Sequence, residues 1–308
     1  DPTFGAMAEQ SMSFSQHQHG CFAESVRHGQ IGWDYYKRHA EPAIRDPLSF
    51  EAHCLLSLGV CCFSGALMGH SDKTRQLGDF YCNRAIEHLP VRFQLYIRLL
   101  RIQTLLMQHC WQRAERECEW LAWADRTHAF GFAQAMGSFF AGWGLLEQGQ
   151  PRAAADALTD ALGLADSNHT TIALSQRLGI LAEAQVLADQ PELARKNAYE
   201  GLRIARESAQ PYWNAELLRV DAMAMAAMNA EHPSVCKRFE QSLAVANEQG
   251  AGLLSMRTCA AFVRYLLDQR RFDAARKTLQ ALPASFEQGG DSAELRHIIE
   301  LRMAISAE

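Results

Sequence analysis

The sequence of 308 residues lacks a long hydrophobic segment and has no strong excess of charge of either sign. No uninterrupted apolar run approaches the length of about 18 residues that marks a membrane-spanning helix, so we expect no membrane contact. The chain has 30 basic and 35 acidic residues, which gives a formal net charge of -5. Because nucleic-acid phosphates attract basic surfaces, we expect no direct contact with nucleic acid.

Catalytic and cofactor-binding motifs are also missing. The sequence has no Walker A motif (GxxxxGK[ST]) and no evident helix-turn-helix or basic recognition helix. Cysteines and histidines are numerous, but none has the sequence context of a Cys/His hydrolase, which needs a nucleophile, a base and an oxyanion donor in one pocket. We therefore expect a non-enzymatic chain without a cofactor. Nine cysteines, an odd number, in a long chain without a recognisable secretory leader favour free thiols in the cytoplasm.

The composition is that of a folded protein, with 48% hydrophobic and 21% charged residues. Strand signals are almost absent, because the few β-branched residues lie inside helical patterns. The first residues, DPTFGAM, fit neither a helix nor a targeting peptide. We expect residues 1–13 to be a vector-derived tag or a disordered tail.

An internal repeat dominates the rest of the chain. Short breaks interrupt the apolar helical stretches at 69–71, 109–111, 149–151, 189–191, 231–233 and 270–272. A residue that is usually small follows each break at a fixed offset; these residues are Thr74, Ala114, Ala154, Ala194, Val235 and Ala275. Their successive spacings are 40, 40, 40, 41 and 40 residues, which indicates a repeat architecture.

Each repeat unit reads as two helices. The first helix ends at the break, at 96–109, 133–147, 172–188, 215–230 and 255–269, and the second follows it, at 112–123, 152–164, 192–207, 236–249 and 273–282. The small residue lets the two helices cross closely. Because a lone pair cannot bury its apolar stripes, the units must stack. We predict an all-α, right-handed α-solenoid of about six to seven hairpins over 14–290, with a C-terminal capping helix within 291–308.

The core pattern Gly/Asp-x-Pro-x-x-Ala is similar to the tetratricopeptide repeat (TPR), whose usual period is about 34 residues. Three segments, 142–150 (GWGLLEQGQ), 212–219 (YWNAELLR) and 286–291 (FEQGGD), resemble the C-terminal TPR region of bacterial predicted-ATPase transcriptional regulators and class III cyclase-type signalling proteins. The resemblance implies a sensory or interaction region that is attached to an output domain in those proteins.

Two clusters of soft ligands need an interpretation. His17, His19, Cys21 and His28 could bind zinc or copper, although a polar segment with incidental histidines is the stronger alternative. Cysteines at 54, 61 and 62 share one apolar helix and favour core packing over redox sensing. Nearby arginines could favour the thiolates of Cys110 and Cys118.

The concave face of such a stack is lined by the first helix of each unit. The repeat register directs a set of aromatic and polar residues toward this groove: Phe63, Tyr96, Gln103, Phe139, Trp143, Gln176, Glu183, Arg257 and Arg264. Aromatic residues would supply contact area, and the polar groups would fix orientation. The alternative for Phe139 and Trp143 is packing between units.

Together these patterns predict a non-enzymatic binding module, the sensor or protein-interaction region of a bacterial signalling or transcription regulator. Its groove would bind a peptide, a partner segment or a small effector. A free-standing TPR scaffold is the first alternative, and a metal- or redox-responsive sensor is the second. A homodimer is compatible with each.

Overall fold

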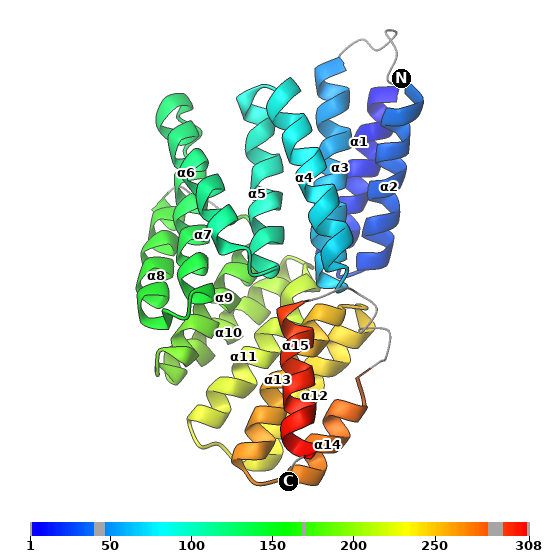
Figure 1. Cartoon of the computed structure of the whole chain (residues 1–308). Coiled ribbons are helices and arrows are strands. Elements are labelled where there is room, and N and C mark those ends of the chain that lie inside the picture. The colour runs from blue at the N-terminus through cyan, green and yellow to red at the C-terminus, as the bar shows by residue number, and fades with distance from the viewer. Residues whose placement is uncertain (1, 40–46, 168–170, 283–291, 307–308) are drawn as a thin grey trace.

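The computed structural model describes residues 2–39, 47–167, 171–282 and 292–306. Within these ranges the chain forms fifteen α-helices and one short 3-10 helix, with no strand (Figure 1). The predicted all-α solenoid is confirmed. Segment 286–291, which carries part of the TPR resemblance, lies outside the described residues.

Seven consecutive helix pairs are followed by a single C-terminal helix. The pairs are α1 (Pro2–Gln18) with α2 (Phe22–His39), α3 (Pro47–Leu67) with α4 (Ser71–His88), α5 (Val91–Met107) with α6 (Trp111–His128), α7 (Ala133–Glu147) with α8 (Pro151–Ser167), α9 (Leu174–Leu187) with α10 (Pro191–Glu207), α11 (Asn214–Ala227) with α12 (His232–Glu248), and α13 (Gly252–Asp268) with α14 (Phe272–Gln280). The short helix η1 (Pro211–Trp213) precedes α11, and α15 (Ala293–Ser306) ends the fold.

The helices form two layers. Odd-numbered helices contact one another in succession from α1 through α13 to α15, and each even-numbered helix packs against the odd-numbered helices before and after it. The odd-numbered helices therefore make the inner layer of the solenoid, and the even-numbered helices from α2 to α14 make the outer layer. This is the arrangement that the repeat register predicts.

The repeat is visible in the backbone where the first helix of each unit ends. One residue there adopts a left-handed conformation, which closes the helix by turning the chain. These residues are Gly69, His109, Gly149, Asp189, Asn229 and Arg270, with φ angles of 95°, 54°, 73°, 64°, 54° and 56°. The repeat period found in the sequence is thus the spacing between these left-handed residues at the ends of successive first helices.

The small residue of each unit lies where its two helices meet. Ala154, Ala194, Val235 and Ala275 are fully buried, and Ala114 is nearly so. A larger side chain at this position would push the paired helices apart. Their burial is what the predicted close crossing requires.

The N-terminal segment does not behave as the sequence suggested. Residues Pro2–Gln18 form α1, which packs against α2 and α3, so the expectation of a disordered tail over residues 1–13 is wrong for the described part. The buried face of α1 consists of Ala6, Ser13 and His17. Because these residues are small or polar, α1 has no apolar stripe that marks it as a helix.

The solenoid closes on itself. The ring of His17 on α1 lies 5.0 Å from the ring of Tyr212 in η1, between centroids. Helix α3 also contacts α13, and a Cβ at Gly69 would lie 3.9 Å from the backbone nitrogen of Leu253. The first helices of the chain therefore pack against η1 and α13 (Figure 1).

Helix α3 is the one described helix that is long and apolar enough to cross a membrane. Within the fold, 83% of its apolar window is buried against neighbouring helices. Its composition is therefore explained by its place in the inner layer, between α1 and α5.

Candidate binding site on the inner face

Four of the predicted groove residues are buried. Phe63, Phe139, Trp143 and Gln176 each expose 2% or less of their surface. They belong to the interior, so their predicted placement on an open groove is wrong. For Phe139 and Trp143 the alternative, packing between units, is the one observed.

The closure of the solenoid is the reason for this burial. The rings of Phe22 and Phe63 lie 5.5 and 4.8 Å from the ring of His17, and the rings of Trp143 and Trp213 meet edge to face at 6.5 Å. The hydroxyl of Tyr212 donates a hydrogen bond to Oε1 of Gln176 at 3.2 Å. We call the residues His17, Phe22, Phe63, Phe139, Trp143, Gln176, Tyr212 and Trp213 the central cluster.

Two further predicted residues stay apart from the others. Tyr96 is 47% exposed and stacks on Phe132, with 5.9 Å between the ring centroids. The amide of Gln103 donates to the carbonyl of Leu99 on its own helix at 3.4 Å. Neither residue joins a shared site with the remaining predicted groove residues.

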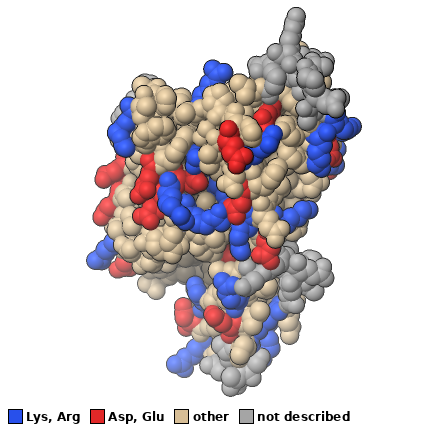
Figure 2. Space-filling view, turned by 45° about the horizontal axis from the view of Figure 1, so that its top comes forward, with Lys and Arg blue, Asp and Glu red and all other residues tan. Residues whose placement is uncertain are grey.

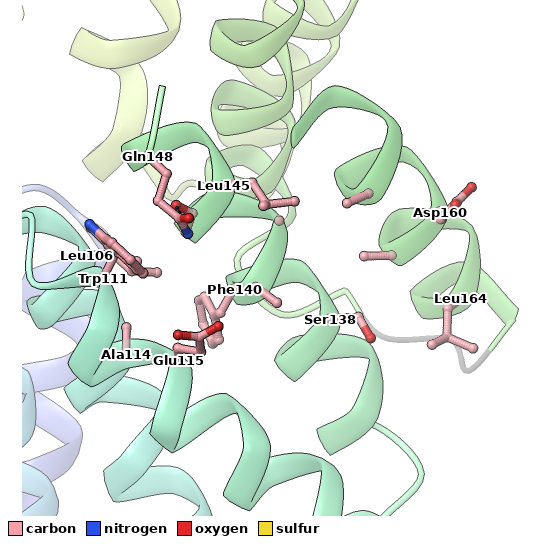
Figure 3. Close-up of a pocket in the computed structure, with 15 residues that line it drawn as sticks. Leu106, Trp111, Ala114, Glu115, Ser138, Phe140, Leu145, Gln148, Asp160 and Leu164 are labelled. Atoms are coloured by element: carbon pink, nitrogen blue, oxygen red, sulfur yellow. Dashed lines mark hydrogen bonds between the residues drawn. The ribbon is translucent and has the colours of Figure 1, made fainter. Parts of the chain in front are cut away.

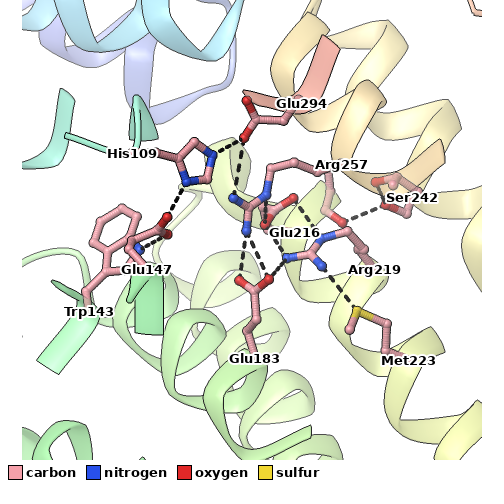
Figure 4. A network of polar contacts seen from close by, with 12 residues as sticks. His109, Trp143, Glu147, Glu183, Glu216, Arg219, Met223, Ser242, Arg257 and Glu294 are labelled. Carbon is pink, nitrogen blue, oxygen red and sulfur yellow. Dashed lines mark hydrogen bonds and ion pairs between the residues drawn. The ribbon is translucent and has the colours of Figure 1, made fainter. Parts of the chain in front are cut away.

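The last three predicted residues, Glu183, Arg257 and Arg264, come together at one polar site. Arg257 Nη2 lies 2.8 Å from Glu183 Oε2, and Arg257 Nε lies 3.1 Å from Glu216 Oε2. Arg219 Nη2 lies 2.7 Å from a carboxylate oxygen of both Glu183 and Glu216 (Figure 4). These side chains come from α9, α11 and α13, which are successive helices of the inner layer.

A second set of contacts extends this site to the C-terminal helix. His109, in the turn after α5, contacts Glu147 through Nδ1 and lies 2.7 Å from Glu294 Oε1 through Nε2. The indole of Trp143 donates to Glu147 Oε1 at 3.1 Å, which connects the site to the central cluster. Arg257 Nη1 also lies 4.0 Å from Glu294 Oε1. Glu294 lies in the first turn of α15, so this helix is tied to the inner layer (Figure 4).

We call His109, Glu147, Glu183, Glu216, Arg219, Arg257 and Glu294 the inner-face network. Burial alone would raise the pKa of Glu183, but Arg219 and Arg257 outweigh it and hold the pKa at about 2. Burial would lower the pKa of His109, but hydrogen bonds to Glu147 and Glu294 raise it to about 10. Three cations therefore face four carboxylates within one partly buried site.

A cavity of about 400 Å³ opens beside the network. Its wall includes His109, Glu183, Arg219, Arg257 and Glu294 from the network, together with Arg264, His297 and Met223. Arg264 is exposed and forms no ion pair with any residue that the structure describes. The site thus combines a paired, buried interior with a cation at its mouth, Arg264, that has no ion-pair partner among the described residues.

Five members of the network were not among the predicted site residues: His109, Glu147, Glu216, Arg219 and Glu294. One signal was available, because the charged residues Glu216, Arg219 and Asp221 interrupt the apolar pattern of helix α11 (NAELLRVDAMAMAA). Burying a charge is unfavourable unless a partner is present, so charges on a core-facing helix indicate a network. No local signal points to Glu294, which reaches His109 across 185 residues of sequence.

The proposed metal ligands do not form a cluster. His17 Nδ1 is bonded to Ser64 Oγ at 2.9 Å, His19 Nδ1 is bonded to the Ser15 carbonyl at 2.7 Å, and His28 pairs with Glu9. Among the described residues, no group of three or more His, Cys, Asp or Glu side chains is arranged to hold a metal ion.

The cysteines are free thiols, and most are buried. Burial raises the pKa of Cys54 to about 12 and that of Cys61 to about 11, as expected for core residues. Burial also raises the pKa of Cys118 to about 12. The suggestion that nearby arginines favour the Cys118 thiolate is therefore wrong.

No family model and no curated protein matches the sequence. The fold is similar to the crystal structure of a Rap protein complexed with competence and sporulation factor, at 8% identity and a TM-score of 0.65, over 96% of this chain and 74% of that one. It is also similar to the apo form of RapI, at 10% identity and a TM-score of 0.58, over 98% of this chain and 99% of that one. At these identities the likeness shows the fold alone, a TPR-like helical repeat solenoid.

Proposed function

We propose that this chain is a non-enzymatic binding module that holds a peptide or partner segment at the inner-face network. The observation that carries the proposal is the network itself, in which charged side chains from α7, α9, α11, α13 and α15 converge beside a cavity of about 400 Å³. Binding sites typically combine a concave surface with a few convergent polar groups.

The energetics of burial support a role in recognition. Arg219 and Glu216 expose only 4% and 2% of their side chains. Removing two charges from water is so unfavourable that an apolar pair of similar volume often stabilises a fold as well or better. Stability alone therefore does not explain why the inner layer carries this buried pair. Recognition of a polar ligand would explain why these charges are present.

Arg264 at the cavity mouth indicates the chemistry of the ligand. Arg264 has no described carboxylate partner, whereas His109 and Arg257 both face the carboxylate of Glu294. We infer that a carboxylate of the ligand, from an acidic side chain or a chain terminus, first pairs with Arg264. It then competes with Glu294 for His109 and Arg257, which releases the start of α15.

The solved neighbours support this proposal at the level of the fold, since one of them is a Rap protein complexed with competence and sporulation factor. The TPR resemblance adds a cellular context. We propose that the module works in the cytoplasm as the sensor region of a bacterial signalling or transcription regulator. Ligand binding would then shift the conformational population of an output domain.

The experiment is a selection of displayed random peptides against the full chain, followed by affinity measurement with each enriched peptide. We expect wild-type protein to bind enriched acidic peptides, and Arg264→Glu to weaken them by about tenfold or more, because the charge at the mouth reverses. Arg126→Glu is the matched control, since Arg126 is exposed on α6 and lies away from the network.

Three results would contradict the proposal. The first is a selection that enriches no peptide. The second is a set of peptides that bind Arg264→Glu as tightly as they bind the wild-type protein. The third is an equal loss of affinity in Arg264→Glu and Arg126→Glu, because only the net charge of the protein would then matter.

A further inference from the structure

A second groove lies in the outer layer, away from the inner-face network. Helices α6 and α8 both pack against α7 and leave between them a groove of about 470 Å³ (Figure 3). Its apolar walls include Leu106, Trp111, Phe140, Leu145 and Leu164. Neither the central cluster nor the inner-face network contributes a side chain to it.

The floor of the groove is made of small residues. Ala141, Gly142 and Gly144 come from α7, and Ala114, Ala157 and Ala161 come from the flanking helices. A Cβ placed on Gly144 would meet no atom within 4 Å, so the space above this residue is open. Small residues let a helix backbone approach closely, at the separations of about 8–10 Å that packed helices adopt.

The rims of the groove are acidic. Glu115 on α6 and Asp160 on α8 lie on opposite sides of it, and both are exposed (Figure 3). Glu119 and Asp156 lie one helical turn away on the same helix faces. None of these four carboxylates forms an ion pair with a described residue, and no lysine or arginine lines the groove. Figure 2 shows acidic side chains on the side of the molecule where α6 and α8 lie.

We propose that the α6–α8 groove is a docking site for an amphipathic helix of a partner protein, with leucine-like residues on one face and lysines or arginines along its edges. The open apolar floor fits the apolar face of such a helix, as in other helix-in-groove complexes. The unpaired carboxylates on the two rims fit its basic edges. The rim carboxylates attract a basic helix and repel an acidic peptide. An acidic peptide is instead the ligand proposed for the inner-face network.

The experiment uses a fluorescent model helix of sequence LKKLLKLLKKLLKL and the full-length chain. We expect binding that weakens as salt is added, because exposed charges are screened. The variant Gly144→Leu fills the groove from its floor and should weaken binding by about tenfold or more. Gly163→Leu makes the same change on an exposed position of α8 that does not line the groove and should leave binding unchanged.

Charge is tested separately with the double variant Glu115→Gln/Asp160→Asn. We expect it to weaken binding several-fold and to reduce the dependence on salt. The acidic counterpart, LEELLELLEELLEL, should not bind the wild-type protein. Thermal melting of each variant checks that it folds. The two Gly→Leu variants should not lose helix stability, because leucine is a better helix former than glycine.

The proposal is overturned if Gly144→Leu binds the basic helix as tightly as the wild-type protein does, or if the acidic helix binds equally well. It is also overturned if the wild-type protein is a dimer that Gly144→Leu converts to a monomer, because a second copy then occupies the groove. A failure of the inner-face selection leaves these measurements unaffected, so the two proposals stand or fall separately.

Discussion

Trp143 connects the two parts of the interior. Its ring packs in the central cluster against Trp213, and its indole nitrogen donates to Glu147 of the inner-face network. A residue at this position contributes to the fold through buried area and to the site through one hydrogen bond. Its larger contribution is packing, because only 2% of its surface is exposed.

We therefore predict that Trp143→Ala destabilises the protein by about 3–5 kcal/mol, the usual cost of removing a large buried aromatic side chain. The measurement is chemical denaturation. Tyr96→Ala is the control, because Tyr96 is 47% exposed and its removal should change stability by about 0.5 kcal/mol or less. If Trp143→Ala has the stability of the wild-type protein, the Trp143 ring is exposed on the surface rather than buried.

His109 gives the network a pH dependence. Its two carboxylate partners raise its pKa to about 10 in the folded state, whereas the unfolded value is near 6.5. Its contribution to stability is therefore complete below pH 6.5 and is lost as the pH rises from 6.5 toward 10. We predict that the stability difference between wild-type protein and His109→Gln, measured by denaturation at several pH values, shrinks over this interval. A difference that stays constant or grows with pH would mean that His109 is not a charged partner of Glu147 and Glu294.

At the scale of the elements, the repeat was predictable and α1 was not. Each break carries a turn residue and a small crossing residue at a fixed offset, and these features depend only on neighbours in the sequence. The helix α7 (Ala133–Glu147) was predicted with its observed bounds. Helix α1 buries Ser13 and His17 through hydrogen bonds to Ser25 and Ser64, contacts that no local apolar pattern reveals.

The crossing residues lead to a test of the register. Ala194 is fully buried where α9 meets α10, with no room for a larger side chain. We predict that Ala194→Trp destabilises the protein by at least about 2 kcal/mol through overpacking. Ala153→Trp is the matched control at an exposed position of α8. Equal melting temperatures for the two variants would disprove the assigned register.

Helix α15 is tied to the inner layer by Glu294, which is buried and contacts His109 and Arg257. We predict that Glu294→Gln, which removes the charge, increases amide hydrogen exchange along α15 by about tenfold, because local opening becomes easier. Glu300→Gln changes an exposed carboxylate of the same helix and should leave the exchange rates unchanged. Similar rates in both variants would show that Glu294 does not hold α15 in place.

At the scale of the whole molecule, closure of the solenoid decides which residues remain open. The repeat register correctly identified the inner layer, and three of the residues that it named, Glu183, Arg257 and Arg264, line one cavity. It could not give the superhelical pitch, which sums small rotations between units. That pitch brings α1 and η1 together, and the central cluster then fills the space where Phe63, Phe139 and Trp143 were expected to bind a ligand.

The closure contact is sensitive to acid. Burial lowers the pKa of His17 to about 3, so the folded protein keeps this ring neutral. Between pH 6.5 and 3 the unfolded chain takes up a proton that the folded chain excludes, so stability is full above pH 6.5 and is lost as the pH falls. We predict a loss of about 2 kcal/mol between pH 7 and pH 5 that is present in the wild-type protein and absent in His17→Gln. Denaturation curves with the same pH dependence for both proteins would contradict the burial of a neutral His17.

The most direct test of the inner-face proposal is a crystal structure of the full chain with an acidic peptide obtained from the selection. We predict that a peptide carboxylate pairs with Arg264 and replaces Glu294 beside His109 and Arg257, with the first turn of α15 moved away. A peptide bound elsewhere, with the contacts of Glu294 to His109 and Arg257 intact, would contradict the proposal that the inner-face network is a binding site closed by α15.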